Sequence, residues 1–199
     1  MNKPILILTA LEVERLAIEH YLKNIELILH PITGTDYTSG TYRCNDRILD
    51  VIVARTDQTN VNAAIETERA IAHFEPEYVF FAGVAGGLKD VEVGDIIIGR
   101  DVYGFERGKT EDNVFKPRPQ FGASSYALER LASQYAKSTA WNQRVENLLN
   151  SDFAPVIRTF TGTIASGEKV NASIDSDLHK FLKQNASHAL GIEMEGLGF

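Results

Sequence analysis

The sequence has little cysteine, no long apolar run and no excess of positive charge. Cys44 is the only cysteine among 199 residues, so no disulfide can form within the chain. Without a basic leader before an apolar run, we expect a cytoplasmic protein. No stretch approaches the roughly 18 apolar residues of a membrane span. A net charge of -7 excludes general attraction to nucleic acid or to anionic membranes. The composition does not exclude binding of a small molecule.

Metal and nucleophile patterns are also missing. The histidines show no spacing typical of metal ligands, and Cys44 has no obvious partner, so we expect no metal and no redox cofactor. A serine nucleophile elbow with its histidine and acidic partners is absent as well. The histidines are His20, His30, His73, His179 and His188.

Short β-branched runs alternate with helical patterns along the chain, which predicts an α/β fold. The apolar run 78–82 is typical of a strand that is buried on both faces at a central, parallel position. Residues 103–120 carry mixed charges and two prolines, so we expect an extended loop there. The other expected strands are 4–10, 25–29, 41–44, 48–54, 96–98, 156–165 and 189–193. The expected helices are 11–22, 60–74 with Asn60 as N-cap, 124–138 and 174–184.

These elements predict one domain over residues 1–199. Its mixed, partly parallel central sheet is expected to lie between layers of helices. The 25–54 region predicts a β-meander, because Gly34-Thr35-Asp36 and Asn45-Asp46 supply turn residues between its strands.

Three short motifs stand where expected strands end. Residues 9–14 read Thr-Ala-Leu-Glu-Val-Glu, residues 83–87 read Gly-Val-Ala-Gly-Gly, and residues 191–196 read Gly-Ile-Glu-Met-Glu-Gly. Each places carboxylates or bare backbone at a strand end, where open α/β sheets bind their ligands. Taken alone, each has a structural explanation as well: a helix start, a tight turn, and a capped helix beside a core methionine.

Together with residues 88–96, Leu-Lys-Asp-Val-Glu-Val-Gly-Asp-Ile, these motifs resemble the purine nucleoside phosphorylase and methylthioadenosine/adenosylhomocysteine nucleosidase superfamily, in particular its nucleosidase branch. The resemblance spans nearly the whole chain. It implies a three-layer, nucleoside phosphorylase-like domain that cleaves the bond between ribose and a purine, without a cofactor. Residues 102–109 and 116–119 further resemble the version of this domain found in larger bacterial signalling or defence proteins.

The resemblance also implies roles for acidic residues. Glu14 aligns with the glutamate that activates the attacking water, whereas we interpret Glu12 as a helix-start residue. Glu195 aligns with the glutamate that accepts hydrogen bonds from ribose hydroxyls, and Met194 with the methionine under the sugar. A carboxylate can accept from two vicinal hydroxyls at once.

Other positions line the base and the 5′ substituent in the family. Val170 stands in place of an aromatic residue that stacks on adenine. Gln58 is the middle residue of a glycine-x-glycine turn whose glycines are here Asp57 and Thr59, and its polarity suits a polar 5′ group. The expected substrate-binding residues are Glu195, Met194, Glu193, Gly83, Val84, Ala85, Gly86, Val170 and Gln58.

The same alignment favours water over phosphate as the nucleophile. Phosphorylases of the superfamily bind phosphate through an arginine, a serine and a glycine-arginine pattern, and here these places hold Phe81, Val84 and residues 9–11. A phosphate needs several aimed donors or a cation to offset its lost hydration. We therefore expect hydrolysis of a purine, in particular adenine, nucleoside or nucleotide.

The resemblance also implies that part of the domain is missing, and it leaves two alternative functions. The family protonates the leaving purine with an aspartate on a later strand, and this sequence ends before it at Phe199. We therefore expect a domain without its last strand and helix, weakly active or inactive alone. The alternatives are a phosphate-dependent phosphorylase and a non-catalytic nucleoside-binding or effector module. The expected partners are a small-molecule purine nucleoside or nucleotide, a second copy in a homodimer, and further domains of a longer chain, but neither nucleic acid nor membrane.

Overall fold

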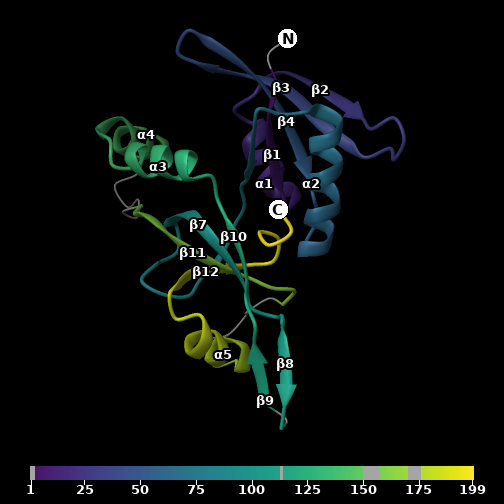
Figure 1. The fold of residues 1–199 in the computed structure, drawn as a ribbon. Coiled ribbons are helices and arrows are strands. Elements are labelled where there is room, and N and C mark those ends of the chain that lie inside the picture. Colours follow the sequence, from purple (N-terminus) through teal and green to yellow (C-terminus); the bar gives the residue numbers. More distant parts are fainter. Residues whose placement is uncertain (1–2, 113, 150–156, 170–175) are drawn as a thin grey trace. The chain divides into compact units, whose positions relative to one another are not determined.

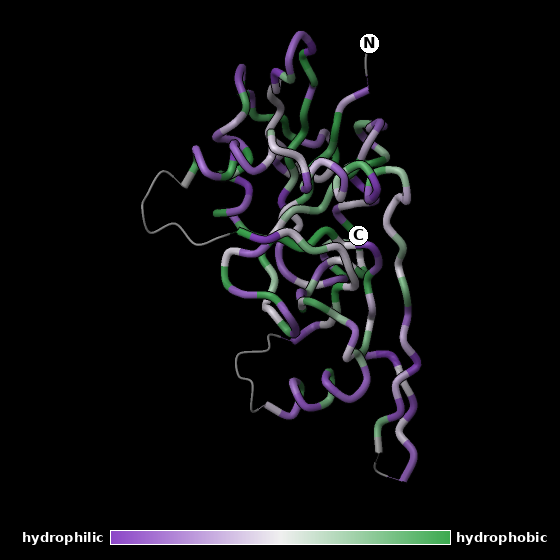
Figure 2. The backbone as a smooth tube through the Cα atoms, turned by 90° about the vertical axis from the view of Figure 1, so that its left-hand side faces the viewer, coloured by the Kyte–Doolittle hydropathy of each residue, from purple (hydrophilic) through white to green (hydrophobic). Residues whose placement is uncertain are grey.

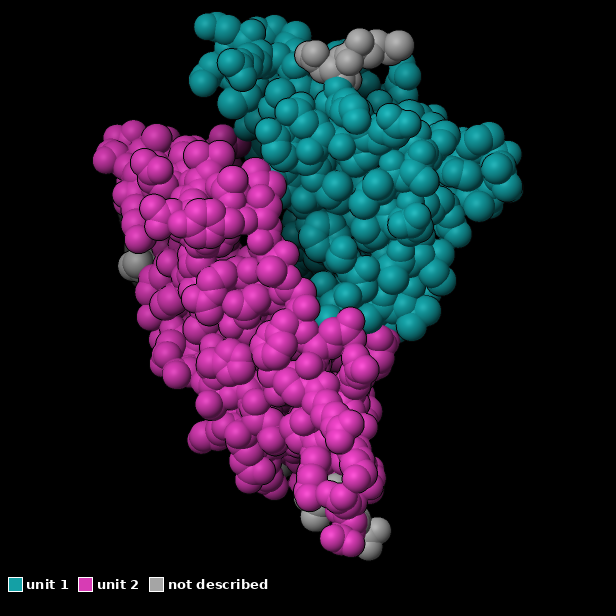
Figure 3. Space-filling view, in the orientation of Figure 1, with its two compact units in different colours: residues 1–84, 194–199 teal, residues 85–193 magenta. Residues whose placement is uncertain are grey.

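The computed structural model describes residues 3–112, 114–149, 157–169 and 176–199 (Figure 1). The chain divides into two compact units, each with its own mixed sheet (Figure 3). Unit 1 comprises residues 1–84 and 194–199, and unit 2 comprises residues 85–193. The α/β class with a mixed, partly parallel sheet and flanking helices is thus confirmed. That residues 1–199 form a single domain stays a prediction.

The sheet of unit 1 has the strand order β2-β3-β4-β1-β5. Its first three strands form the predicted meander, because β2 pairs with β3 and β3 with β4 in antiparallel fashion. β4 and β5 both pair with β1 in parallel, so three neighbouring strands point the same way. The bounds are β1 (Ile5–Thr9), β2 (Lys23–Leu29), β3 (Asp36–Cys44), β4 (Arg47–Arg55) and β5 (Tyr78–Phe81).

Two helices cover opposite faces of this sheet because side chains alternate along each strand. Ala70 and Phe74 of α2 (Asn60–Phe74) pack with Leu6, Leu8 and their neighbours on one face. Ile18, near the end of α1 (Glu12–Glu19), packs with Ile7, Val51 and Val53 on the other. Unit 1 therefore consists of a helix layer, a sheet and a second helix layer.

The sheet of unit 2 has the strand order β10-β7-β11-β12-β6. β7, β11 and β12 are parallel neighbours, and the antiparallel strands β10 and β6 lie at the edges. The bounds are β6 (Gly86–Gly87), β7 (Ile96–Gly104), β10 (Gln120–Ala123), β11 (Thr159–Ser166) and β12 (Ala189–Glu193).

The core of unit 2 lies between this sheet and α5 (Asp177–Asn185). Leu182 and Ala186 at the end of α5 pack against Tyr103, Phe105 and Ala165 of the sheet region. α3 (Tyr126–Tyr135) packs against β7 and β11, and α4 (Thr139–Leu149) follows it directly in the chain. The sequence patterns did not predict α4. No helix within the described ranges is both long and apolar enough to cross a lipid bilayer.

The prediction of an extended loop over residues 103–120 is wrong. β7 continues to Gly104, and β8 (Gly108–Glu111) pairs with β9 (Val114–Pro117) in an antiparallel hairpin. The hairpin is largely hydrophilic (Figure 2), and β8 has no large apolar residue, so the usual alternation of polar and apolar residues is missing from its sequence. Pro117 stands at the end of its strand, where a missing N–H costs little.

Two further expectations need correction. β5 is not buried on both faces: within the described residues it pairs only with β1, and Tyr78 and Phe80 are 42% and 39% exposed. Its unbroken apolar sequence reflects a parallel strand at a sheet edge rather than a central one. Asn60 is not the N-cap of α2, because Thr59 occupies that position and its hydroxyl accepts a hydrogen bond from the Asn62 N–H.

Candidate active site

Glu14 lies in the first turn of α1 and its carboxylate accepts three backbone hydrogen bonds. Oε2 accepts from the N–H groups of Ala10 and Leu11 at 2.9 and 2.8 Å. Oε1 accepts from the N–H of Val84 at 2.8 Å. The first two bonds are what an acidic residue at a helix start ordinarily makes. The third reaches a residue 70 positions away, directly after β5, which helix capping does not require.

The backbone of the turn after β5 lies close to this carboxylate at Gly83, which has no side chain. A Cβ at Gly83 would lie 3.0 Å from Oε1 of Glu14. Glycine thus allows the carboxylate to approach the backbone closely. The predicted approach of a ligand to this turn stays a prediction. Val84 itself is 72% exposed, so its amide binds Glu14 while its side chain faces solvent.

Glu195 is the second acidic residue held by backbone, and it is only 6% exposed. Its Oε1 accepts from the N–H of Thr59 at 3.1 Å, and its Oε2 from the N–H of Met194 at 3.2 Å. A buried carboxylate needs such partners because desolvation of an unpaired charge is costly. Thr59 directly precedes α2, so a loop far from Glu195 in sequence fixes its orientation.

Both carboxylates therefore bind backbone that follows the carboxyl ends of the three parallel strands of unit 1. Glu14 binds residues just after β1 and β5, and Glu195 binds the loop after β4. The ends of β1 and β4 are joined directly, since the Thr56 N–H donates to the Thr9 carbonyl at 2.8 Å. The carboxyl edge of parallel strands is where open α/β sheets bind ligands.

The loop between β4 and α2 has a backbone that normally favours glycine. Asp57 has φ +58° and Thr59 has φ +97°. Residues other than glycine adopt such backbone at a conformational cost. Gln58 between them is exposed, and its carbonyl accepts from Nδ2 of Asn62 at 2.8 Å.

The remaining predicted residues belong to unit 2 or lie outside the described residues. Gly86 pairs with Ile192 between β6 and β12, and a Cβ there would lie 3.2 Å from the Ile192 side chain. Ala85 is exposed beside it. Glu193 ends β12, and its carbonyl accepts from the Gly167 N–H at 3.2 Å. Val170 lies outside the described residues.

Glu12 differs from Glu14 although both stand in the same helical turn. Its carboxylate pairs with Arg15 at 2.6 Å and with Arg55 at 3.3 Å, and its side chain is 46% exposed. The hydrogen bond from Arg15 lowers the pKa of Glu12, and the same bond raises the pKa of Arg15. Glu12 therefore acts as a surface ion-pair residue, in line with its interpretation as a helix-start residue.

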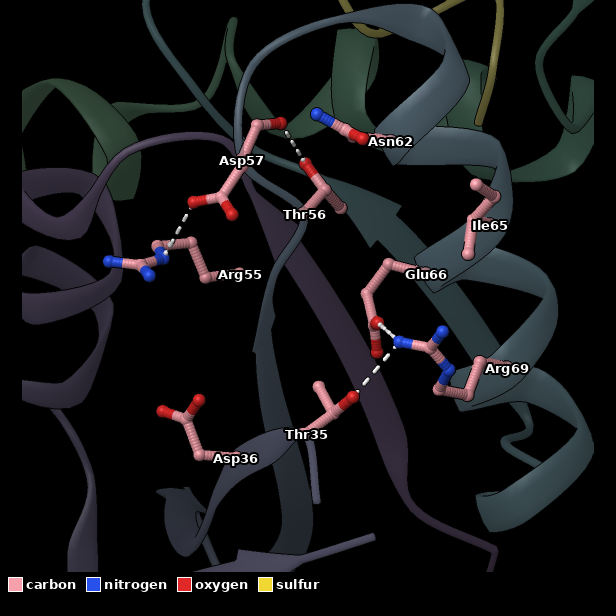
Figure 4. Close-up of a pocket in the computed structure, with 9 residues that line it drawn as sticks. All are labelled: Thr35, Asp36, Arg55, Thr56, Asp57, Asn62, Ile65, Glu66 and Arg69. Carbon is pink, nitrogen blue, oxygen red and sulfur yellow. Dashed lines mark hydrogen bonds and ion pairs between the residues drawn. The ribbon is translucent and has the colours of Figure 1, made fainter. Parts of the chain in front are cut away.

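A polar cavity of about 300 Å³ opens beside α2 (Figure 4). Arg69 donates to Glu66 at 2.6 Å and to Thr35 at 2.9 Å, and Arg55 pairs with Asp57 at 3.1 Å. Burial and the bond to Glu66 raise the pKa of Tyr37. The lining residues are Thr35, Asp36, Arg55, Thr56, Asp57, Asn62, Ile65, Glu66 and Arg69. No predicted site residue is among these described lining residues.

The sequence patterns missed the residues that hold Glu195 in place. A sequence motif could not identify the Thr59 amide, because almost every residue type has the same backbone N–H. Asn60 accepts from the N–H groups of Leu197 and Gly198 at 2.8 and 3.0 Å, so its side chain binds the C-terminal segment. A polar residue at a helix start reads as a cap, and no local signal distinguishes this use.

The chain is similar in sequence to several known nucleosidases. A 5′-methylthioadenosine/S-adenosylhomocysteine nucleosidase of Bacillus pumilus is 28% identical over 193 residues, covering 96% of this chain and 75% of that protein. One of Hydrogenovibrio crunogenus is 34% identical, covering 52% and 46%. An ATP nucleosidase of Escherichia coli is 27% identical, covering 82% and 36%. The matched segments thus cover less than half the length of the last two relatives.

Solved structures agree with the fold. A mutant Helicobacter pylori 5′-methylthioadenosine/S-adenosylhomocysteine nucleosidase with 5′-methylthioadenosine in the active site superposes with a TM-score of 0.75 at 26% identity, covering 100% of this chain and 78% of that one. A futalosine hydrolase mutant from the same species gives a TM-score of 0.71 at 26% identity, covering 98% and 80%. The family model of the phosphorylase superfamily matches residues 4–199, and the chain therefore belongs to this superfamily.

Proposed function

We propose that this protein hydrolyses the N-glycosidic bond of an adenine nucleoside or nucleotide and releases the free base. One observation carries the proposal: Glu14 and Glu195 both bind backbone at the carboxyl edge of the parallel strands β4-β1-β5. The similarity to nucleosidases that act on methylthioadenosine, adenosylhomocysteine and ATP supports the same chemistry. A site of this kind has to hold a ribose and to activate water beside it.

Glu14 is the proposed general base. As the bond between ribose and purine lengthens, its carboxylate accepts a proton from the attacking water, and the negative charge favours the positive sugar-ring transition state. The three backbone bonds fix the carboxylate before substrate arrives, so no reorganisation is needed during the reaction. Glu195 accepts from the ribose hydroxyls, and Met194 packs against the sugar.

The proposed nucleophile is water rather than phosphate, because the two arginines near this edge are already paired. Arg15 is engaged by Glu12, Glu19 and the Thr38 hydroxyl, and Arg55 by Glu12 and Asp57. Cations that are already paired gain less from a phosphate dianion than free cations do. At the turn after β5, the exposed apolar Val84 offers only its backbone N–H, which is bonded to Glu14.

The 5′ substituent is proposed to be polar. Gln58 is exposed between two residues at positive φ, so its amide is presented by a constrained loop. The named relatives act on substrates whose 5′ groups differ widely, from a methylthio group to a triphosphate. A polar amide favours the second kind of group because it can donate hydrogen bonds to oxygen.

The test is a substrate panel on the longer protein that is proposed to contain this chain, because residues 1–199 alone are expected to be weakly active or inactive. Adenosine, methylthioadenosine, adenosylhomocysteine and ATP are incubated with that protein, and free adenine is measured with and without inorganic phosphate. The proposal expects adenine release that does not depend on phosphate. A strict phosphate requirement would instead indicate a phosphorylase. Nucleoside binding without any base release would indicate a binding or effector module.

Assembly is part of the same proposal. We propose that the chain forms a homodimer and belongs to a longer protein with further domains, as the resemblance implies. Size-exclusion chromatography with light scattering measures the first point directly. The cytoplasmic location inferred from the lone Cys44 stays a prediction.

A further inference from the structure

We propose that Thr59 and Asn60, at the start of α2, are positioning residues that fix Glu195 for ribose binding. The inference rests on the proposed function and adds two residues to its site. It starts from the C-terminal segment 194–199, which carries Glu195 and lies beside α2 within unit 1 (Figure 1).

Asn60 holds the turn that follows Glu195. Its Oδ1 accepts from both the Leu197 N–H at 2.8 Å and the Gly198 N–H at 3.0 Å. The Gly198 N–H also donates to the Glu195 carbonyl at 2.9 Å. The turn therefore has one hydrogen bond within itself in addition to its two bonds to Asn60. One side chain at a helix start thereby satisfies two amides of a segment 137 and 138 positions later.

The two segments approach so closely that only glycine fits at position 198. A Cβ at Gly198 would overlap the backbone carbonyl of Asn60. The Phe199 ring then contacts the Phe81 ring at 5.9 Å between centroids, which ties the end of the segment to the last residue of β5. The segment that bears Glu195 is therefore fixed on both sides of its turn.

Thr59 fixes the carboxylate itself, at a conformational cost. A β-branched residue with φ +97° is a genuine outlier, and such backbone persists only where several contacts enforce it. Its N–H donates to Oε1 of Glu195, its hydroxyl accepts from the Asn62 N–H, and its carbonyl accepts from the Ala63 N–H. The strained conformation aims the amide at Glu195 while the same residue begins the helix.

This arrangement has a specific consequence for binding. A carboxylate whose position is set beforehand loses little freedom when it accepts the ribose hydroxyls, so affinity for the sugar is retained. If the turn loosens, Glu195 must be ordered by the ligand, and affinity falls. The loss concerns the ribose only, because the base does not contact this carboxylate in the proposed site.

The experiment compares binding of adenosine and of free adenine by isothermal titration calorimetry, using the full chain with Glu14→Gln in every variant, so that adenosine is not hydrolysed during the titration. Asn60→Ala is expected to weaken adenosine binding about tenfold, the effect of losing a bond to a positioned group, and to leave adenine binding within about twofold. Asn60→Gln, which moves the acceptor by one methylene, is measured beside it in case the alanine variant does not fold. The melting temperature of each variant is recorded.

Val61→Ala is the matched control. Val61 stands one residue further along the same helix start, and its side chain is 62% exposed. Its variant is expected to leave both affinities within about twofold of the parent protein. Equal loss of adenosine and adenine affinity in the Asn60 variants, or the same loss in Val61→Ala, would overturn the positioning role while the proposed function stood. A wild-type chain that binds neither ligand would overturn the proposed function and this inference with it.

Discussion

The two units each contain three parallel neighbouring strands, but the carboxyl ends of these strands are closed in different ways. In unit 1, loops after β1, β4 and β5 present backbone N–H groups to Glu14 and Glu195. In unit 2, the corresponding ends of β7, β11 and β12 are joined by backbone bonds, by one bond from the Glu168 N–H to the Glu106 carboxylate, and by the buried ring of Phe105. A Cβ at Gly167 would overlap that ring.

The difference concerns the acidic side chains. In unit 1, two carboxylates are held by backbone amides that follow all three parallel strands, and in the proposed function they accept a proton and the ribose hydrogen bonds. In unit 2, a buried aromatic ring fills the edge and contributes stability. The same strand arrangement thus carries the proposed catalytic edge in unit 1 and a packed edge in unit 2.

The largest effect is expected from Glu14→Gln. Removing the general base should lower the rate of adenine release about 10²–10⁴-fold, since base catalysis contributes this much. The matched control is Glu12→Gln, in the same helical turn, where only exposed ion pairs are lost and the rate should stay within about twofold. The rate of base release measures both. Equal losses in the two variants would contradict the role of Glu14 as general base.

Phe105→Ala tests the packed edge. Phe105 is 2% exposed in the core of unit 2, so its removal should lower the free energy of unfolding by about 3–5 kcal/mol. Phe80→Ala in unit 1 removes a ring that is 39% exposed and should cost clearly less. Urea denaturation measures both changes. If Phe80→Ala proved the more damaging, the packed edge of unit 2 would lose its assigned role.

Gly83→Ala tests whether activity requires the close approach of the backbone at residue 83 to Glu14. The added Cβ would lie 3.0 Å from Oε1 of Glu14, so the carboxylate must shift, and we expect about a tenfold loss in kcat. Gly122→Ala in β10 is the control, because the nearest side-chain atom to its Cβ would be 4.0 Å away. Steady-state kinetics compare the two variants. Full activity in Gly83→Ala would show that close approach to Glu14 is unnecessary.

Thr59 allows the strain at the catalytic edge to be measured. Thr59→Gly and Thr59→Ala both lose the capping hydroxyl, but only glycine adopts φ +97° without penalty. The glycine variant should therefore be more stable than the alanine variant by about 1 kcal/mol. Chemical denaturation of the pair gives this difference. Equal stabilities would mean that the loop relaxes and that its conformation is not enforced.

The smallest effect is expected from an ion pair of unit 2. The hydrogen bond from Arg158 lowers the pKa of Asp95 to about 2. Because the unfolded value is about 3.9, this pair contributes stability above that pH and loses it as the pH falls toward 2. The melting temperature of Asp95→Asn should therefore fall less steeply between pH 4 and pH 2 than that of the wild type. An unchanged slope would contradict the pairing, and Asp90→Asn serves as the exposed control.

The sequence predicted most elements of both units and the placement of the acidic motifs at strand ends. The meander, β1 and α2 followed from apolar periodicity and turn residues. The hairpin β8–β9 and the helix α4 did not, because charges and short amphipathic runs obscure the periodicity on which such predictions depend. β5 was predicted as central since a parallel edge strand and a central strand have the same apolar sequence.

What the sequence alone determined is the residue types that reactions need: Glu14 and Glu195 near strand ends, glycines between them, and membership of a family with this pattern. Only the tertiary structure decided how those carboxylates are held. Glu14 meets the Val84 amide and Glu195 meets the Thr59 amide through folding of segments 70 and 136 residues apart. The physical reason is that every residue type except proline carries the same backbone N–H, so which amide points at a carboxylate depends on the path of the chain.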